Sequence, residues 1–168
     1  MKPWLIIIIL GFALAGCATL PAALRAPNVT SFTVSEAQQG QAPAGVRVRW
    51  GGTIAQVRNG QAHTWMEIVE QPLARNGRPH RTDQSDGRFL ARFTGFLDPA
   101  IYATGRKLTV VGELEHTQVR TIGQFSYTFP VVKVTSFHLW RPLPKRRYWP
   151  TPNPFWYNPW YPWGYPFY

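Results

Sequence analysis

The sequence predicts an all-β protein built on a small five-stranded OB-like barrel, with one short helix between the third and fourth strands. Five segments rich in alternating or β-branched residues follow one another between residues 46 and 140. Glycines interrupt two of these segments, as is typical of the bends of a barrel. A helix-start signal lies between the third and fourth segments. A small five-stranded barrel of another topology is the alternative.

The first two predicted strands form a hairpin. Residues 46–57, VRVRWGGTIAQV, alternate in polarity up to the pair Gly51-Gly52, where we expect a bulge or a sharp bend. Asn59-Gly60 follows, and this dipeptide tolerates the positive φ angles of a type I′ loop. Residues 62–73 are therefore expected to return as the second strand.

The third strand is predicted over residues 88–96, after a polar loop over residues 74–87. Asp98 then offers a helix N-cap, and Pro99 suits the first position of a helix. Gly105 is a stop signal a few residues later. These signals predict a helix of a single turn that starts at Pro99.

The last two strands are predicted over residues 106–117 and 125–140. Gly112 interrupts the fourth strand and suggests another bend. A turn is expected near Gly123. Pro130 cannot donate a hydrogen bond to a neighbouring strand, so we expect the first part of the fifth strand to lie at an edge or a bulge.

The first residues of the chain predict an export signal of the lipoprotein type. Lys2 precedes an apolar run over residues 4–15, which is shorter than the roughly 20 residues of a membrane-spanning helix. The run closes on Leu14, Ala15, Gly16 and Cys17, which match the bacterial lipobox at all four positions. In proteins with this motif, the signal peptidase cuts before the cysteine, whose thiol and new amino group then carry acyl chains such as palmitate. A chance match after an ordinary export signal is the alternative.

Cys17 is the only cysteine, so no disulfide can form within the chain. Ala18 follows it instead of Asp, which favours sorting to the outer membrane, and the expected partner of Cys17 is outer-membrane lipid. The predicted organisation is a signal peptide, a lipidated cysteine with a tether that holds a short strand at 31–34, a β-barrel domain, and a basic, then aromatic tail. These parts cover residues 1–16, 17–44, 45–141 and 142–168.

Together with the lipobox, two stretches of the β-domain resemble the Slp family. The first is WGGTIAQVRNG at residues 50–60, and the second is GRFLARFTGFLDPAIY at residues 87–102. Shorter matches fall at residues 110–114 and 127–129. The family consists of outer-membrane lipoproteins that are induced by starvation or in stationary phase. The resemblance implies a non-catalytic protein facing the periplasm, with a structural or stress-related role.

The formal charge of +10 suits an anionic membrane surface, nucleic acid or an acidic ligand. An exported domain does not meet nucleic acid in the cytoplasm, so we exclude that partner. Arg88 and Arg92 lie in the family block and are candidate contacts for an anionic envelope polymer or ligand, while an envelope protein is a further candidate partner. A purely structural role for this block is the alternative.

The sequence offers no arrangement for catalysis or metal binding. Glu113, Glu115 and His116 form the nearest approach to a ligand cluster, but strand alternation would place His116 on the opposite face from the two carboxylates. A zinc site needs three or four converging ligands. No serine stands beside a base in a recognisable nucleophile arrangement. We therefore expect no enzymatic activity, no metal and no cofactor.

The C-terminal tail predicts contact with a membrane interface. Residues 148–168 contain no charged side chain and six prolines, which exclude a helix or a central strand. Tryptophan and basic side chains concentrate where a bilayer meets water. Docking on the barrel or on a partner protein, and a tail that binds nothing, are the alternatives. The candidate interface residues are Lys145, Arg146, Arg147, Trp156, Trp160 and Trp163.

Overall fold

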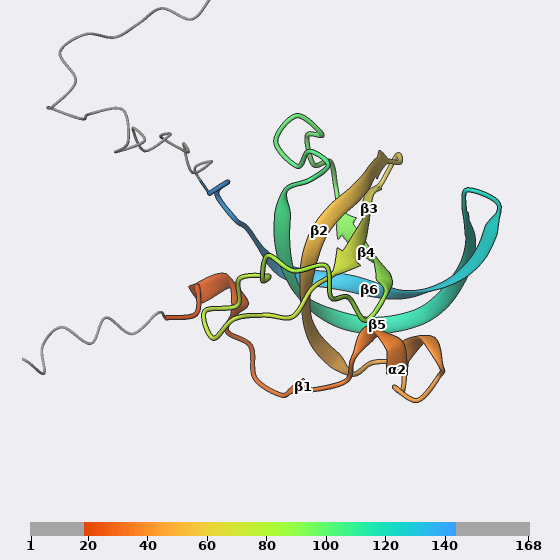
Figure 1. Cartoon of the computed structure of the whole chain (residues 1–168), viewed down its shortest axis with the longest axis horizontal. Helices are drawn as coiled ribbons and strands as arrows, with labels where there is room; N and C mark the ends of the chain where they lie inside the picture. Colours follow the sequence, from red (N-terminus) through yellow and green to blue (C-terminus); the bar gives the residue numbers. More distant parts are fainter. Residues whose placement is uncertain (1–18, 144–168) are drawn as a thin grey trace, which may run out of the picture.

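The computed structural model describes residues 19–143, and most of their regular structure is β-sheet (Figure 1). Two very short helices and six strands follow one another along the chain. They are η1 (Ala22–Leu24), β1 (Val29–Thr30), α2 (Val34–Gln38), β2 (Arg47–Asn59), β3 (His63–Glu70), β4 (Arg88–Thr94), β5 (Lys107–Ile122) and β6 (Phe125–Leu139). Within these residues, no helix is both long enough and apolar enough to cross a membrane.

The prediction of a mostly β protein is confirmed, and β2 to β6 correspond to the five predicted strands. The largest difference is the end of β5, which continues past the predicted residue 117 to Ile122. There it pairs with the start of β6, and the two form a hairpin arm that extends from the rest of the molecule (Figure 1). The turn at its tip falls at Gly123, as predicted.

The strands form one sheet in the order β1-β2-β3-β4-β6-β5, and β2 also pairs with β5. Strands β2, β3, β4, β6 and β5 therefore make a closed ring. The pair β4–β6 is parallel, and the other pairs of the ring are antiparallel. Figure 1 shows β5 and β6 as a long curved pair that sweeps beneath the other three strands.

Two glycine predictions had different outcomes. The pair β2–β3 does have a register shift, but it lies between Ile54 and Gln56 instead of at Gly51-Gly52. Gly52 allows the backbones of β2 and β3 to approach each other closely, because a Cβ atom there would lie 1.8 Å from the carbonyl oxygen of Val69. Gly112 does mark a bulge, since the register of β5 and β6 shifts beside it.

The loop between β2 and β3 is a hairpin connection, as predicted, but it is not a type I′ turn. It contains the three residues 60–62, and neither Asn59 nor Gly60 has a positive φ angle. The backbone N–H of Gly60 donates to the carbonyl of His63 at 2.8 Å. The Asn-Gly signal was right about the position of the turn and wrong about its geometry.

The predicted helix at Pro99 is absent, and a hydrogen-bonded turn takes its place. The carbonyl of Asp98 accepts from the N–H groups of Ile101 and Tyr102, at 3.0 and 2.9 Å. The Asp98 side chain also caps the turn by accepting from the Ala100 N–H at 2.8 Å. Gly105 then donates to the carbonyl of Ile54 on β2. The chain is thus tied to the sheet before a second helical turn can form.

Residues 19–44, expected to be a tether, pack against the sheet over much of their length. The strand expected at 31–34 is wrong, because β1 lies two residues earlier and pairs in parallel with β2. Thr33 and Glu36 form a capping box that starts α2. The side chains of Leu24 and Val34 are fully buried.

The prediction that Pro130 lies at an edge or a bulge is confirmed. β4 pairs with β6 from Val131 onward, so β5 is the only strand with which the preceding part of β6 pairs. Pro130 itself stands beside the second register shift of the β5–β6 pair, where Leu114 and Thr117 face Val132 and Pro130. This shift determines which side chains of β5 reach the candidate site.

The main hydrophobic core fills the ring. Trp50 and Phe89 meet edge to face there, with ring centroids 5.4 Å apart. A second cluster, around Leu90 and Phe129, also contacts Ile122 and Tyr127 of the hairpin arm. A third joins Leu24 to Trp140 and therefore holds the N-terminal segment against the end of β6.

Candidate binding groove

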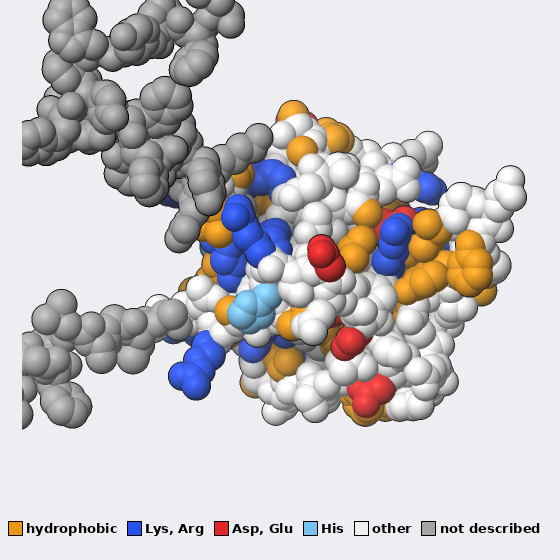
Figure 2. Space-filling view, in the orientation of Figure 1, with side chains coloured by type: hydrophobic (Ala, Val, Ile, Leu, Met, Phe, Trp, Pro, Cys, Tyr) orange, Lys and Arg blue, Asp and Glu red, His pale blue; other side chains and the backbone are white. Residues whose placement is uncertain are grey.

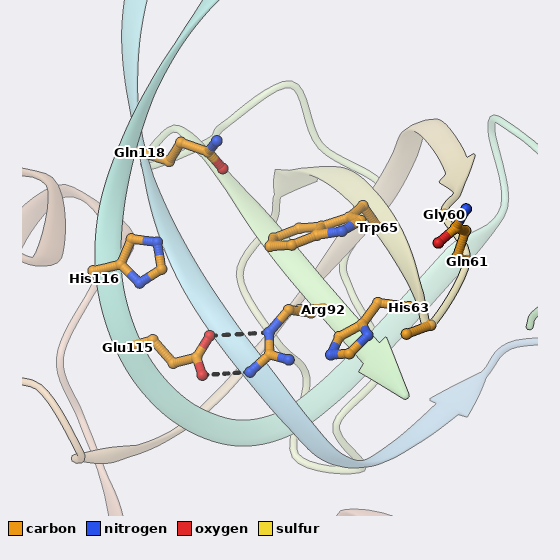
Figure 3. Close-up of a pocket in the computed structure, with 9 residues that line it drawn as sticks. Gly60, Gln61, His63, Trp65, Arg92, Glu115, His116 and Gln118 are labelled. Atoms are coloured by element: carbon orange, nitrogen blue, oxygen red, sulfur yellow. Dashed lines mark hydrogen bonds and ion pairs between the residues drawn. The ribbon is translucent and has the colours of Figure 1, made fainter. Parts of the chain in front are cut away.

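A groove with a volume of about 600 Å³ opens between the β2–β3 hairpin and β5 (Figure 3). Four consecutive parts of the fold contribute side chains to it: the hairpin loop, β3, β4 and β5. Its lining residues are Gly60, Gln61, Ala62, His63, Trp65, Arg92, Glu115, His116 and Gln118.

Strand alternation explains two of these positions. Thr64 and Met66 on β3 are fully buried, so Trp65 between them and His63 before them face the other way. His63 and Trp65 consequently share the groove-facing side of β3 (Figure 3).

The β-bulge in β5 explains why Glu115 and His116 both reach the groove. Two residues of β5 stand opposite the single residue Val131 of β6, which breaks the alternation of side chains at that point. The prediction that His116 lies on the opposite face from Glu115 is therefore wrong. Glu113 does not join them, because it pairs with Arg47 at 3.5 Å and does not line the groove.

An ion pair crosses the floor of the groove. The guanidinium of Arg92 donates to both carboxylate oxygens of Glu115, at 3.1 and 2.5 Å. The Arg92 hydrogen bond lowers the pKa of Glu115 below its ordinary value of 4.5, and partial burial opposes that effect. The two charges cancel each other. The ion pair therefore presents polar atoms without a net charge beside the aromatic ring of Trp65.

Trp65 is the aromatic surface of the groove. The guanidinium carbon of Arg120 lies 5.3 Å from the centre of its ring, and Arg120 belongs to a different, small pocket on which Trp65 also borders. Trp65 further packs against the cluster of Leu90 and Phe129. These contacts fix the indole ring in place while it still lines the groove.

The two arginines predicted as ligand contacts are in separate places. Arg88 does not line the groove, and its guanidinium donates to Glu67 at 2.6 Å. Its backbone N–H donates to the hydroxyl of Tyr127 on the hairpin arm, at 2.8 Å. Each predicted arginine thus already has a carboxylate partner, which weighs against capture of a further anion. Contact of either residue with a ligand stays a prediction.

Sequence reasoning had singled out Arg92, Glu115 and His116, but it missed the aromatic side of the groove. The signal that could have found it is the phase of β3: Trp65 falls on the side of the strand opposite to the buried Met66. Among residues 19–143, no group of three His, Cys, Asp or Glu side chains converges as metal ligands.

Ten predicted site residues lie outside the described residues. The lipobox residues precede them and the tail residues follow them. They are Leu14, Ala15, Gly16, Cys17, Lys145, Arg146, Arg147, Trp156, Trp160 and Trp163.

A family model described as the outer membrane lipoprotein Slp family matches residues 14–168. The chain therefore belongs to this family of outer-membrane lipoproteins, as the sequence motifs predicted. The match includes residues 14–17, the ring and the tail, and family membership supports an outer-membrane location.

Three relatives agree with this assignment. The uncharacterized lipoprotein YeaY of Escherichia coli is 35% identical, over 76% of this chain and 66% of its own length, just under two thirds. The outer membrane protein Slp of the same species is 30% identical, over 80% of this chain and 73% of its own length. An uncharacterized protein of Haemophilus influenzae is 30% identical, over 77% of this chain and 71% of its own. None of these three names states a catalytic activity.

Solved structures add no further argument. A small single-stranded DNA-binding protein from Streptomyces coelicolor matches 56% of this chain and 94% of its own length, with a TM-score of 0.39 and 15% identity. The mitochondrial single-stranded DNA-binding protein Rim1 from S. cerevisiae has the same coverage and identity, with a TM-score of 0.32. Both likenesses are too weak to assign a fold or a function to this chain.

Proposed function

We propose that this protein is a non-catalytic lipoprotein, acylated at Cys17 and facing the periplasm, with a structural or protective role during starvation or stress. The observation that carries the proposal is the family match, which begins at residue 14, the first residue of the lipobox. Acyl chains on one cysteine give stable anchoring, because each buried CH₂ contributes about 0.8 kcal/mol. The folded domain is then free to make other contacts.

Replacing Cys17 by Ser tests the anchor. The variant should accumulate as an uncut precursor of higher apparent mass without bound acyl chains, whereas a Ser35→Ala control should be processed normally. Electrophoresis and labelling with a radioactive fatty acid read out both properties. Normal cutting and labelling of the Cys17→Ser variant would refute the proposal.

We also infer that the ring of five strands is an OB-like barrel. Its antiparallel strands, closed by the parallel pair β4–β6, support that interpretation. The face of such barrels that carries the second and third strands is a frequent binding surface for oligosaccharides and oligonucleotides. In this chain, those strands are β3 and β4, which supply three of the groove residues: His63, Trp65 and Arg92.

A second candidate function is therefore recognition of an envelope saccharide in the groove. A sugar ring has apolar C–H faces that stack on an indole ring. The hydroxyls around its edge form hydrogen bonds with amide, imidazole, guanidinium and carboxylate groups. Trp65 offers the first kind of contact. Gln61, His116 and the Arg92–Glu115 pair offer the second. The internal neutralisation of that pair favours a neutral sugar over the anionic ligand expected from the sequence.

The groove is tested with the full-length lipoprotein in detergent and a neutral trisaccharide of N-acetylglucosamine as the probe. A ligand that binds only the folded state raises the melting temperature in a saturable way. Substitution of the exposed Gln61 and His116 by Ala should abolish the rise, while the exposed Gln124, at the tip of the arm, serves as a matched control. An equal rise with the groove variant would refute the site.

A further inference from the structure

Five cations line a pocket of about 220 Å³. The chain segments that supply them lie on the side of the molecule opposite the hairpin arm (Figure 1). The cations come from the loop after β3, from the start of β5 and from the chain after β6. Gly105, Trp140, Pro142 and Leu143 complete the lining, and Leu143 is exposed. We call this surface the basic face; its cations are Arg78, Arg81, Arg106, Lys107 and Arg141.

The cations of the basic face have no carboxylate partner among residues 19–143. The three ion pairs in that part of the chain belong to Arg47, Arg88 and Arg92. On the basic face, Arg78 and Arg106 donate instead to the carbonyls that follow β6, at 2.7 and 3.0 Å.

Lys107 shows the electrostatic result of this arrangement. Its ammonium donates to the carbonyl of His80 and to the side chain of Gln71. Burial lowers the pKa of Lys107, and the charges of Arg81 and Arg78 lower it further. These side chains therefore repel one another, and an anion from outside would relieve the repulsion.

The basic face lies beside the start of the described chain. A Cβ atom on Gly77 would lie 2.7 Å from Cδ1 of Leu20, so Leu20 packs against the residue that precedes Arg78. Cys17 is three residues before Leu20, a distance that the chain spans in at most about 11 Å. Figure 1 shows both ends of the described chain on the same side of the molecule, and in Figure 2 Lys and Arg side chains gather there.

We propose that the basic face docks on anionic phospholipid headgroups of the leaflet that holds the protein. Guanidinium groups bind phosphate oxygens in a fork, and each cation near an anionic leaflet strengthens binding about fivefold. Docking in this way points the hairpin arm away from the bilayer. The orientation rests on the Cys17 anchor proposed above, whereas the contact with headgroups rests on the five cations alone.

The test uses the lipoprotein reconstituted into vesicles of phosphatidylcholine, with or without phosphatidylglycerol. Cys17 is the only cysteine and has no free thiol once acylated, so a fluorophore attaches only to an introduced cysteine. His80→Cys places it in the loop of the basic face, and Val119→Cys places it on the arm. A headgroup-linked quencher should quench the label at residue 80 in anionic vesicles, and much less in neutral ones. The label at residue 119 should stay bright in both.

A matched pair of double variants isolates the basic face. Arg81→Gln with Arg141→Gln removes two of its exposed cations, and Arg58→Gln with Lys133→Gln removes two exposed cations elsewhere. The first variant should weaken docking about 25-fold and abolish the quenching at residue 80. The second should leave the quenching near the level of the unmodified protein.

Equal quenching at residue 80 in neutral vesicles, or quenching that survives Arg81→Gln with Arg141→Gln, would overturn the proposal. Mass spectrometry of the N-terminal peptide reports acylation of Cys17 separately. Without acyl chains, the anchor proposal fails by itself. Sedimentation of the same full chain with the two vesicle types then decides the docking, which is overturned if the two double variants sediment alike.

Discussion

The Arg92–Glu115 pair determines how the groove can interact with a ligand. A lone arginine at this position would attract anions, and a lone glutamate would attract cations. Because both are present, with side chains only 20% and 26% exposed, neither charge is available without breaking a two-armed hydrogen bond. The groove therefore selects by shape and by hydrogen bonding more than by charge.

The same pair predicts how stability depends on pH. The folded protein holds the pKa of Glu115 below its ordinary value of 4.5, so the pair stabilises the fold above that pH. The contribution is lost as the pH falls through the lowered pKa. Glu115→Gln should therefore lower the melting temperature at pH 7 and leave it nearly unchanged in strong acid. Circular dichroism melts across this range measure the difference, and a constant gap at every pH would contradict the prediction.

What could be predicted at single residues depended on regular alternation. Arg92 lies in a strand without a register shift, between the buried Ala91 and Phe93, so its side chain points away from theirs. The position of His116 did not follow from alternation, because a bulge two residues long is a property of the β5–β6 pair and not of β5 alone. Trp65 was missed for another reason. A tryptophan in a strand is usually assigned to the core, although the alternation of β3 places Trp65 on the side opposite to the buried Thr64 and Met66.

β2 is the element on which the ring depends, because β3 and β5 pair with it on opposite edges. Gly52 stands in the stretch where both neighbours contact β2 at once. The close approach measured there leaves no room for a side chain, and the obstructing atom is backbone, which cannot rotate away.

Gly52→Ala is therefore expected to destabilise the protein by about 3 kcal/mol or more. Gly60→Ala is the control, since Gly60 is exposed, lies outside the strands and has an ordinary φ angle. Urea unfolding monitored by tryptophan fluorescence gives both free energies. A similar small loss for the two variants would show that β3 and β2 can separate without cost.

The strands were predictable, and the short helices were not. Five runs of alternating or β-branched residues predicted β2 to β6, and buried side chains are present in all five strands. The cap at Asp98 was a correct local signal, yet the tie between Gly105 and β2 left room for one turn only. The capping box of Thr33 and Glu36 was present in the sequence and went unused, since the surrounding composition resembled a linker.

On the scale of the whole molecule, the N-terminal segment is joined to the ring by burial. Leu24 is fully buried and belongs to the same cluster as Trp140, more than a hundred residues later in the chain. Leu24→Ala should consequently cost about 2–5 kcal/mol of unfolding free energy. Val119→Ala, at a position 65% exposed, is the control and should cost little. If chemical denaturation gave equal values for both, residues 19–44 would behave as a tether after all.

No local sequence pattern could predict that the ring closes. β2 meets β5 through pairs such as Arg47 with Glu113, 66 residues apart, and no property of either strand by itself specifies this partner. The net charge likewise did not predict where the charged side chains lie. The total of +10 gave no indication that three arginines are paired with carboxylates while five cations gather at one end.

The position of β6 in the ring has a consequence for how the chain is made. Among residues 19–143, β6 is the last strand to be synthesised, yet it lies between β4 and β5. Until it has emerged, β4 has one edge unpaired and the apolar interior is open to water, so the nascent protein cannot fold in steps from its N-terminus. Distant strand pairing of this kind is slow, and the waiting chain is prone to aggregate. A holding chaperone would thus protect this protein most during the synthesis of its final third.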